Sequence, residues 1–183
     1  MRWMGVPQSG QGVATIPNDW RLTTIADFNG DGKADVLWRN SSGALTMWLM
    51  NGATVPAQAN LGTVPLDWQI YGGADFNGDG KADILWRNAT GSMVMWLMNG
   101  LSPLAGPSVG NVSIDWHIAG TGDFNADGKA DILWRHDNGT VAFWLMNGAS
   151  LTGSGGASGT GYDWHLVNGE HDRPAIAINP GPC

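Results

Sequence analysis

The stretch Asp27-Phe28-Asn29-Gly30-Asp31-Gly32-Lys33-Ala34-Asp35 contains the pattern on which the rest of the chain is built. It returns at residues 75–83 and, with an alanine in place of the first glycine, at residues 123–131. Each copy has Asp, Asn, Asp and Asp at its first, third, fifth and ninth positions, and successive copies begin 48 residues apart. The stretch therefore indicates both a metal-binding loop and a sequence repeat.

The tryptophans follow the same repeat. All eleven fall into three columns. The first column is Trp20, Trp68, Trp116 and Trp164; the second is Trp38, Trp86 and Trp134; the third is Trp48, Trp96 and Trp144, which Trp3 joins through a partial match. We expect the second and third columns to pack between repeats, because both lie within apolar segments.

Each repeat reads as four short strands. In the second repeat, apolar runs at residues 68–73, 83–87 and 93–98 are bounded by Gly and Asn, which is typical of buried strands, and a looser fourth segment follows at 106–112. Asn-Gly pairs after the third segment predict hairpin turns. Four antiparallel strands repeated at this spacing predict an all-β fold, a β-propeller of four-stranded blades.

We expect residues 1–183 to form a single propeller domain with whole blades at 20–67, 68–115 and 116–163. Residues 1–19 resemble the last two segments of a repeat and residues 164–183 the first two, so the two ends would together form a split fourth blade and close the ring. The fourth segment of the third repeat, at 153–161, is so rich in glycine that we expect it to resemble a linker.

The three loops carry the hard oxygen ligands that calcium prefers, and we predict about three calcium ions, one in each loop. The predicted ligands are Asp27, Asn29, Asp31, the carbonyl of Lys33 and Asp35; Asp75, Asn77, Asp79, the carbonyl of Lys81 and Asp83; and Asp123, Asn125, Asp127, the carbonyl of Lys129 and Asp131. Magnesium favours fewer protein ligands, and zinc favours nitrogen and sulfur. An EF-hand is excluded because its twelfth position, a Glu, is a Trp here. Acidic turns without metal remain the alternative.

The composition limits the kinds of ligand and partner that the protein can bind. A net charge of −7 argues against a nucleic-acid ligand, since phosphate binding requires clustered basic residues. The single cysteine, Cys183, allows neither a disulfide framework nor a zinc cluster. No apolar run is long enough for a membrane span. We expect a secreted, extracellular protein, because calcium is plentiful there, and either a monomer or a small homo-oligomer.

The loop motif followed by Ile-Leu-Trp-Arg, as at residues 84–87, resembles the FG-GAP/VCBS-type repeat of integrin-like calcium-binding propellers, a family that includes propeller lectins. The resemblance covers nearly the whole chain. It implies a propeller with calcium between the first two strands of each blade. Relatives with about seven blades are usual, so four blades would be a departure, and two chains combining or a piece of a larger propeller remain alternatives.

The first tryptophan column begins a strand next to an aspartate, and we expect it to reach a groove between blades. The predicted ligand-binding residues are Trp20, Asp67, Trp68, Asp115, Trp116, Asp163 and Trp164. Arg39, Arg87 and Arg135 are expected to pair with nearby carboxylates. No arrangement of nucleophile, base and orienting residue is visible, so we predict no enzyme activity. The leading interpretation is a calcium-stabilised carbohydrate-binding module; the alternative is a structural or protein-binding adhesion propeller without a glycan ligand, natural, excised or engineered.

Overall fold

The computed structural model describes residues 12–157, and these form thirteen strands joined by turns, with no helix in that range. The first blade consists of β1 (Trp20–Ala26), β2 (Asp35–Asn40), β3 (Ala44–Asn51) and β4 (Thr54–Thr63). The second consists of β5 (Trp68–Ala74), β6 (Asp83–Asn88), β7 (Ser92–Asn99), β8 (Ser102–Ala105) and β9 (Ser108–Asn111). The third consists of β10 (Trp116–Gly122), β11 (Asp131–His136), β12 (Val141–Asn147) and β13 (Ser150–Ala157).

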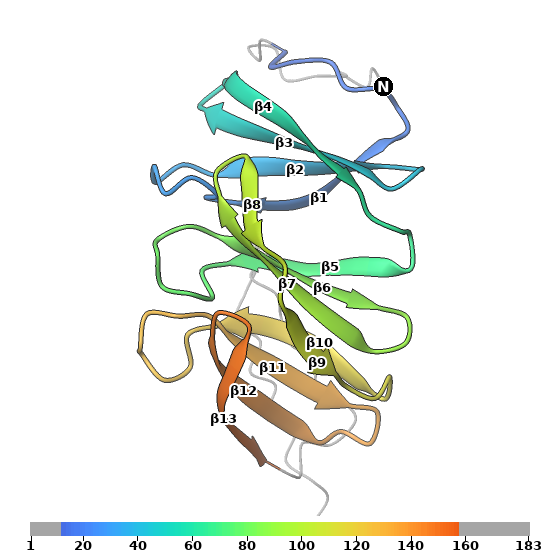
Figure 1. Ribbon diagram of the computed structural model, residues 1–183, viewed down its shortest axis with the longest axis vertical. Helices are drawn as coiled ribbons and strands as arrows, with labels where there is room; N and C mark the ends of the chain where they lie inside the picture. Colours follow the sequence, from blue (N-terminus) through green and yellow to red (C-terminus); the bar gives the residue numbers. More distant parts are fainter. Residues whose placement is uncertain (1–11, 158–183) are drawn as a thin grey trace, which may run out of the picture.

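Each blade is an antiparallel sheet in which strands pair in the order of the sequence, except that β9 pairs with β7. Figure 1 shows the three sheets following one another along the long axis. The first strands of adjacent blades contact each other, β1 with β5 and β5 with β10. The acidic loops lie at one end of every sheet and the β2–β3, β6–β7 and β11–β12 turns at the other (Figure 1). The predicted all-β fold with propeller-type blades is confirmed, whereas the proposed split blade, residues 1–19 with 164–183, lies mostly outside the described residues.

The predicted hairpins form where expected. Gly52, Gly100 and Gly148 follow the asparagines that end β3, β7 and β12, with φ of +58°, +59° and +59°. Only glycine adopts this left-handed conformation at little cost, which explains the Asn-Gly pairs.

The outer strands correct two predictions. In the second blade the fourth segment begins at Ser102, earlier than expected, and is divided at Gly106-Pro107 into β8 and β9, which both pair with β7. Proline lacks the N–H that a continuous strand would donate. In the third blade residues 153–157 of the glycine-rich segment belong to the strand β13, which pairs with β12 with one irregularity in register at Leu145 and Met146. A Cβ at Gly155 would lie 2.4 Å from the ring of Phe143, so glycine here makes room for an aromatic neighbour.

The core lies between blades. One buried cluster joins Phe28, Leu37 and Met47 of the first blade to Ile84 and Trp86 of the second. An equivalent cluster joins the second blade to the third. Because β6, for example, is buried on both faces, its sequence is a continuous apolar run rather than an alternating one, whereas the outer strand β4 alternates between exposed and half-buried residues.

Backbone hydrogen bonds fasten each blade to the next at the start of the acidic loop. The carbonyl of Asp27 accepts from the N–H of Ala82 at 2.7 Å, and the carbonyl of Phe28 accepts from Gly100 at 2.8 Å. The second junction repeats both bonds at 2.7 Å, from Ala130 to Asp75 and from Gly148 to Phe76. The loop therefore holds neighbouring blades together as well as joining two strands of its own blade. Within residues 12–157, no helix is long and apolar enough to cross a membrane.

Candidate ligand and metal sites

The first aspartate of each loop organises the turn. Oδ1 of Asp27 accepts from the N–H groups of Gly30 and Asp31, and Oδ2 accepts from Gly32 at 2.7 Å. Asp75 does the same in the second loop, and Asp123 accepts from Asp127 and Gly128 in the third. These bonds lower the pKa of Asp123, the Gly128 N–H contributing most. The alternating Asp and Asn spacing is thus a run of side-chain-capped turns.

The ninth-position aspartate points into the blade. Asp35, Asp83 and Asp131 are fully buried. In the second blade Oδ2 of Asp83 accepts from the N–H of Phe76 at 3.1 Å, and Oδ1 accepts from Met98 at 2.9 Å. Asp35 and Asp131 make the same pair of bonds in their own blades. Each carboxylate therefore joins the loop start to the end of the third strand.

Burial makes the charge on two of these aspartates, Asp83 and Asp35, unfavourable. Desolvation raises the pKa of Asp83 to about 6, and the charges of Asp79 and Asp75 reinforce the effect against the two backbone hydrogen bonds. Burial likewise raises the pKa of Asp35. By contrast, the hydrogen bond from Lys33 lowers the pKa of the exposed Asp31. Nearby loop carboxylates thus repel the buried one, which is the electrostatic condition that a bound cation would relieve.

The donor set fits calcium in its chemistry, since each loop supplies three carboxylates and one amide oxygen. Its arrangement is less converged: among residues 12–157, no three His, Cys, Asp or Glu side chains gather closely enough to hold a metal ion. In the first loop Oδ2 of Asp31 contacts Nζ of Lys33 at 3.1 Å instead.

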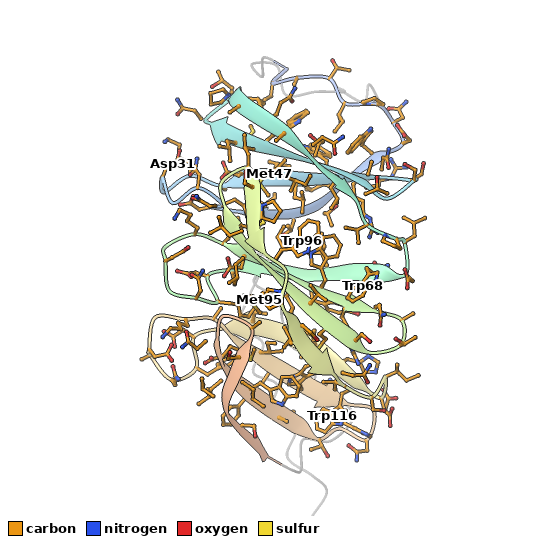
Figure 2. All side chains as sticks on the ribbon, viewed as in Figure 1. Asp31, Met47, Trp68, Met95, Trp96 and Trp116 are labelled. Atoms are coloured by element: carbon orange, nitrogen blue, oxygen red, sulfur yellow. The ribbon has the colours of Figure 1, made fainter. Side chains whose placement is uncertain are left out.

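The first tryptophan column lies at the end of the blades opposite the acidic loops. Figure 2 shows Asp31 on one side, and Trp68 and Trp116 on the other. Trp20, Trp68 and Trp116 are all half-buried at the start of an inner strand. Asp67 is exposed, and Trp164 and Asp163 lie outside the described residues. Near Trp20, an open groove of about 470 Å³ is lined by polar groups that include Asp19, Arg21, Asn40 and Gln69.

A cavity of about 250 Å³ lies at Trp116 in the third blade, lined by Val112, Trp116, Trp134, Ala142 and Trp144. It brings together all three tryptophan columns of one repeat. The ring centres of Trp134 and Trp144 are 5.1 Å apart, and the buried Nε1 of Trp134 has no hydrogen-bond partner. The second and third columns, expected to serve packing, therefore also line a cavity here.

Comparison with known proteins agrees with this repeat architecture. Residues 27–86 and 75–134 each match the model of the FG-GAP-like repeat, which together is more than half of the chain. The chain belongs to the FG-GAP-like repeat family. No curated protein matches the sequence. Among solved structures, the crystal structure of BamB from Moraxella catarrhalis is similar at 14% identity and a TM-score of 0.39, over 73% of this chain and 36% of that one. The FG-GAP-like chain thus spans little more than a third of that chain's length.

In this FG-GAP-like protein the third blade carries a polar corner at the predicted Asp115 and Trp116, and sequence reasoning missed its other members, His117, His136 and Asp137. The ring of His136 contacts Trp116 edge-on at 4.9 Å, and its Nε2 lies 3.6 Å from Asp115. Nε2 of His117 lies 2.7 Å from Asp137. A hydrogen bond from the Ser113 hydroxyl lowers the pKa of Asp115. The signal was available in the register, because β10 and β11 pair residue 116 with residue 136.

Arg39 and Arg87 do not pair with carboxylates as predicted. Arg87 is 5% exposed and donates to the backbone carbonyls of Trp116, Val112 and Ser113, at 2.6, 3.0 and 2.9 Å. Arg39 donates to the equivalent carbonyls of the first junction. The guanidinium of Arg87 also lies 5.4 Å from the ring centre of Trp134. The fork of donors suits several carbonyls at once, so these arginines fix the inter-blade connection rather than pairing with a carboxylate.

Proposed function

We propose that this FG-GAP-like protein is a non-catalytic binding module that takes a single sugar ring in the Trp116–Trp134–Trp144 cavity. The observation that carries the proposal is the cavity itself, since indole rings from all three tryptophan columns line one space. Sugars offer apolar C–H faces that pack on aromatic rings. The polar corner of Asp115 and His136, in contact with Trp116, could bind hydroxyl groups.

The size of the cavity supports a small ligand. About 250 Å³ is below the roughly 300–1,000 Å³ typical of pockets for drug-sized molecules. Its place in the third blade follows from a single small residue: Ala142 stands where the second blade has Val94, one repeat earlier. In the second blade, Gly106 also packs closely against Trp96, since a Cβ at this glycine would lie 3.2 Å from the indole ring. The second blade therefore has bulkier or closer-packed neighbours at the equivalent positions.

The test is binding to a glycan array, followed by titration of any hit with tryptophan fluorescence. Trp116→Ala and the cavity-filling Ala142→Leu should each weaken binding at least tenfold, whereas Trp68→Ala, the matched change in the second blade, should leave it largely intact. Melting curves identify variants that lose binding by unfolding. A folded wild-type chain that binds no glycan would favour the alternative of a structural or protein-binding propeller.

We also infer that calcium occupies the three acidic loops and that the protein works in extracellular fluid. Support comes from the oxygen donor set and from the raised pKa of Asp83, which burial causes and the charges of Asp79 and Asp75 reinforce. When bound, the ion would draw the loop carboxylates together, neutralise their charge and stiffen the turn. An ion that binds only the folded state stabilises it by about 2.7 kcal/mol at a hundredfold excess over Kd. The melting temperature should therefore fall in excess EGTA and recover with calcium, and an unchanged melting curve would contradict the inference.

A further inference from the structure

The first and third blades each leave one half of an inter-blade junction open. In the two junctions within residues 12–157, the loop phenylalanine of one blade packs against the next blade, and Phe28 and Phe76 are both 0% exposed. The equivalent Phe124 in the third blade is 51% exposed. Leu133 and Phe143 on the same face are only half-buried, although their counterparts in the other two blades are fully buried.

The first blade shows the opposite half. Ala82 and Ala130, whose N–H groups donate to the preceding loop, are 7% and 6% exposed. Their counterpart in the first blade, Ala34, is exposed. Trp38 is half-buried, whereas Trp86 and Trp134 are each 1% exposed. This face still has Ala34, Trp38 and the Asn51-Gly52 turn, whose counterparts in the other two blades lie at the junctions.

The two open faces are complementary because the repeats are nearly identical. The carbonyls of Asp123 and Phe124 correspond to those that accept from the next blade, and the N–H groups of Ala34 and Gly52 correspond to the donors. Figure 1 places the first and third blades at opposite ends of the molecule, so the two faces of one chain do not meet there.

The chain's own C-terminal residues are a poorer match to the third blade. In the 48-residue register, Ile178, Asn179, Pro180 and Pro182 stand where the blades have Ala, Asp, an aliphatic residue and Trp. Proline cannot donate a backbone hydrogen bond, and the sequence there has no tryptophan for the phenylalanine face. The first blade of a second copy offers the complete set.

We propose that two copies of this protein associate head to tail, with the open face of the third blade of one copy docking on the open face of the first blade of the next. The contact reproduces the junction seen twice within the chain: Phe124 is covered, and the carbonyls of Asp123 and Phe124 accept from Ala34 and Gly52 of the second copy. Such an interface is heterologous, so it closes into a ring or continues, depending on its rotation.

The test uses the full 183-residue chain and two variants that each block one face at an exposed position. Phe124→Glu removes the face of the third blade, and Ala34→Glu removes the face of the first. By sedimentation equilibrium over about a hundredfold range around micromolar concentrations, the wild type should exceed the 19.4 kDa of one chain, and each variant alone should remain at that mass. An equimolar mixture of the variants should form dimers of about 39 kDa and nothing larger, because each retains the face that the other lacks.

Leu104→Glu is the control, since Leu104 is 64% exposed on β8 and lies on neither face; this variant should associate as the wild type does. Far-UV circular dichroism and melting curves check folding, and Phe124→Ser replaces Phe124→Glu if the charge proves disruptive. The proposal is overturned by a wild type that stays monomeric throughout, as it would if its own terminal segments covered both faces. It is equally overturned by variants that still self-associate, or by a mixture that stays monomeric.

Discussion

Replacing Asp83 with alanine tests whether the aspartate at the ninth loop position stabilises the blade without a bound ion. Its two carboxylate oxygens accept from the N–H groups of Phe76 and Met98, at 3.1 and 2.9 Å, in a site with no solvent exposure. Alanine removes both acceptors, and the closed packing leaves the two donors without water as a substitute. Asparagine retains one acceptor oxygen but turns an NH₂ group towards the second donor.

The expected loss follows from these contacts. An unpaired buried donor costs about 1–3 kcal/mol, so two cost roughly 2–6 kcal/mol. The ionised carboxylate is itself disfavoured by burial, as its raised pKa shows, and alanine relieves that cost. We therefore expect the lower part of the range, about 2–4 kcal/mol, for Asp83→Ala and about 1–2 kcal/mol for Asp83→Asn. Against a typical domain stability of about 5–15 kcal/mol, the alanine variant should unfold at clearly lower urea concentration.

The assay is urea unfolding followed by tryptophan fluorescence at pH 7, first in EGTA and then in calcium. Asp79→Ala is the control, because Asp79 is exposed and lies in the same loop. In EGTA, Asp83→Ala should lose stability and Asp79→Ala should stay within about 0.5 kcal/mol of the wild type. If calcium binds, both variants should lose the calcium-dependent increment. If the urea unfolding curve of Asp83→Ala in EGTA overlies that of the wild type, Asp83 does not stabilise the blade without an ion.

Three further predictions follow from the same contacts. The folded-state pKa of Asp83, about 6, exceeds its ordinary 3.8, so the contribution of this carboxyl to the free energy of unfolding is largest below about pH 4 and is lost as the pH rises through 6. In EGTA, the stability of the wild type relative to Asp83→Asn should therefore fall between pH 4 and 6. A difference that stays constant with pH would contradict this prediction. Arg87→Lys keeps the charge but loses the fork on three carbonyls, so it should cost about 2–4 kcal/mol in urea melts, whereas Arg21→Lys at an exposed site should cost less than about 0.5 kcal/mol. Ala126 has φ +62° where the other loops have glycine, so Ala126→Gly should raise stability by up to about 1 kcal/mol, and a lower melting temperature would show that the turn is not strained.

The repeat made the fold predictable. A fixed period carrying Asn-Gly turns and short apolar runs leaves few architectures that can bury every strand on both faces. The division of the second outer strand depended on Gly106-Pro107, and the pairing of β13 depended on Phe143 needing space beside Gly155. The first depends on a backbone donor that proline lacks, and the second on a contact with the neighbouring strand, which the composition of the segment alone does not reveal.

The candidate cavity was predictable only in part. The first tryptophan column indicated Trp116, but the cavity exists because Ala142, on a different strand, is smaller than Val94 at the same position one repeat earlier. A difference of two methyl groups between repeats is visible in the sequence. Its consequence depends on the register that places Ala142 opposite Trp134 of β11, two residues before Trp144 on β12 itself.

The ninth-position aspartate shows why a sequence motif can fail to separate structure from ligand binding. A calcium ligand at Asp83 and an acceptor for two buried N–H groups both require a carboxylate at the same place. Each carboxylate oxygen has two lone-pair sites, and the backbone occupies one on each oxygen, so the roles are chemically compatible. The backbone bonds explain why an aspartate is needed without an ion, and the raised pKa explains why an ion would strengthen the site. Asparagine can serve the first role in part but supplies no charge for the second, so comparing Asp83→Asn with Asp83→Ala in EGTA and in calcium separates the two contributions.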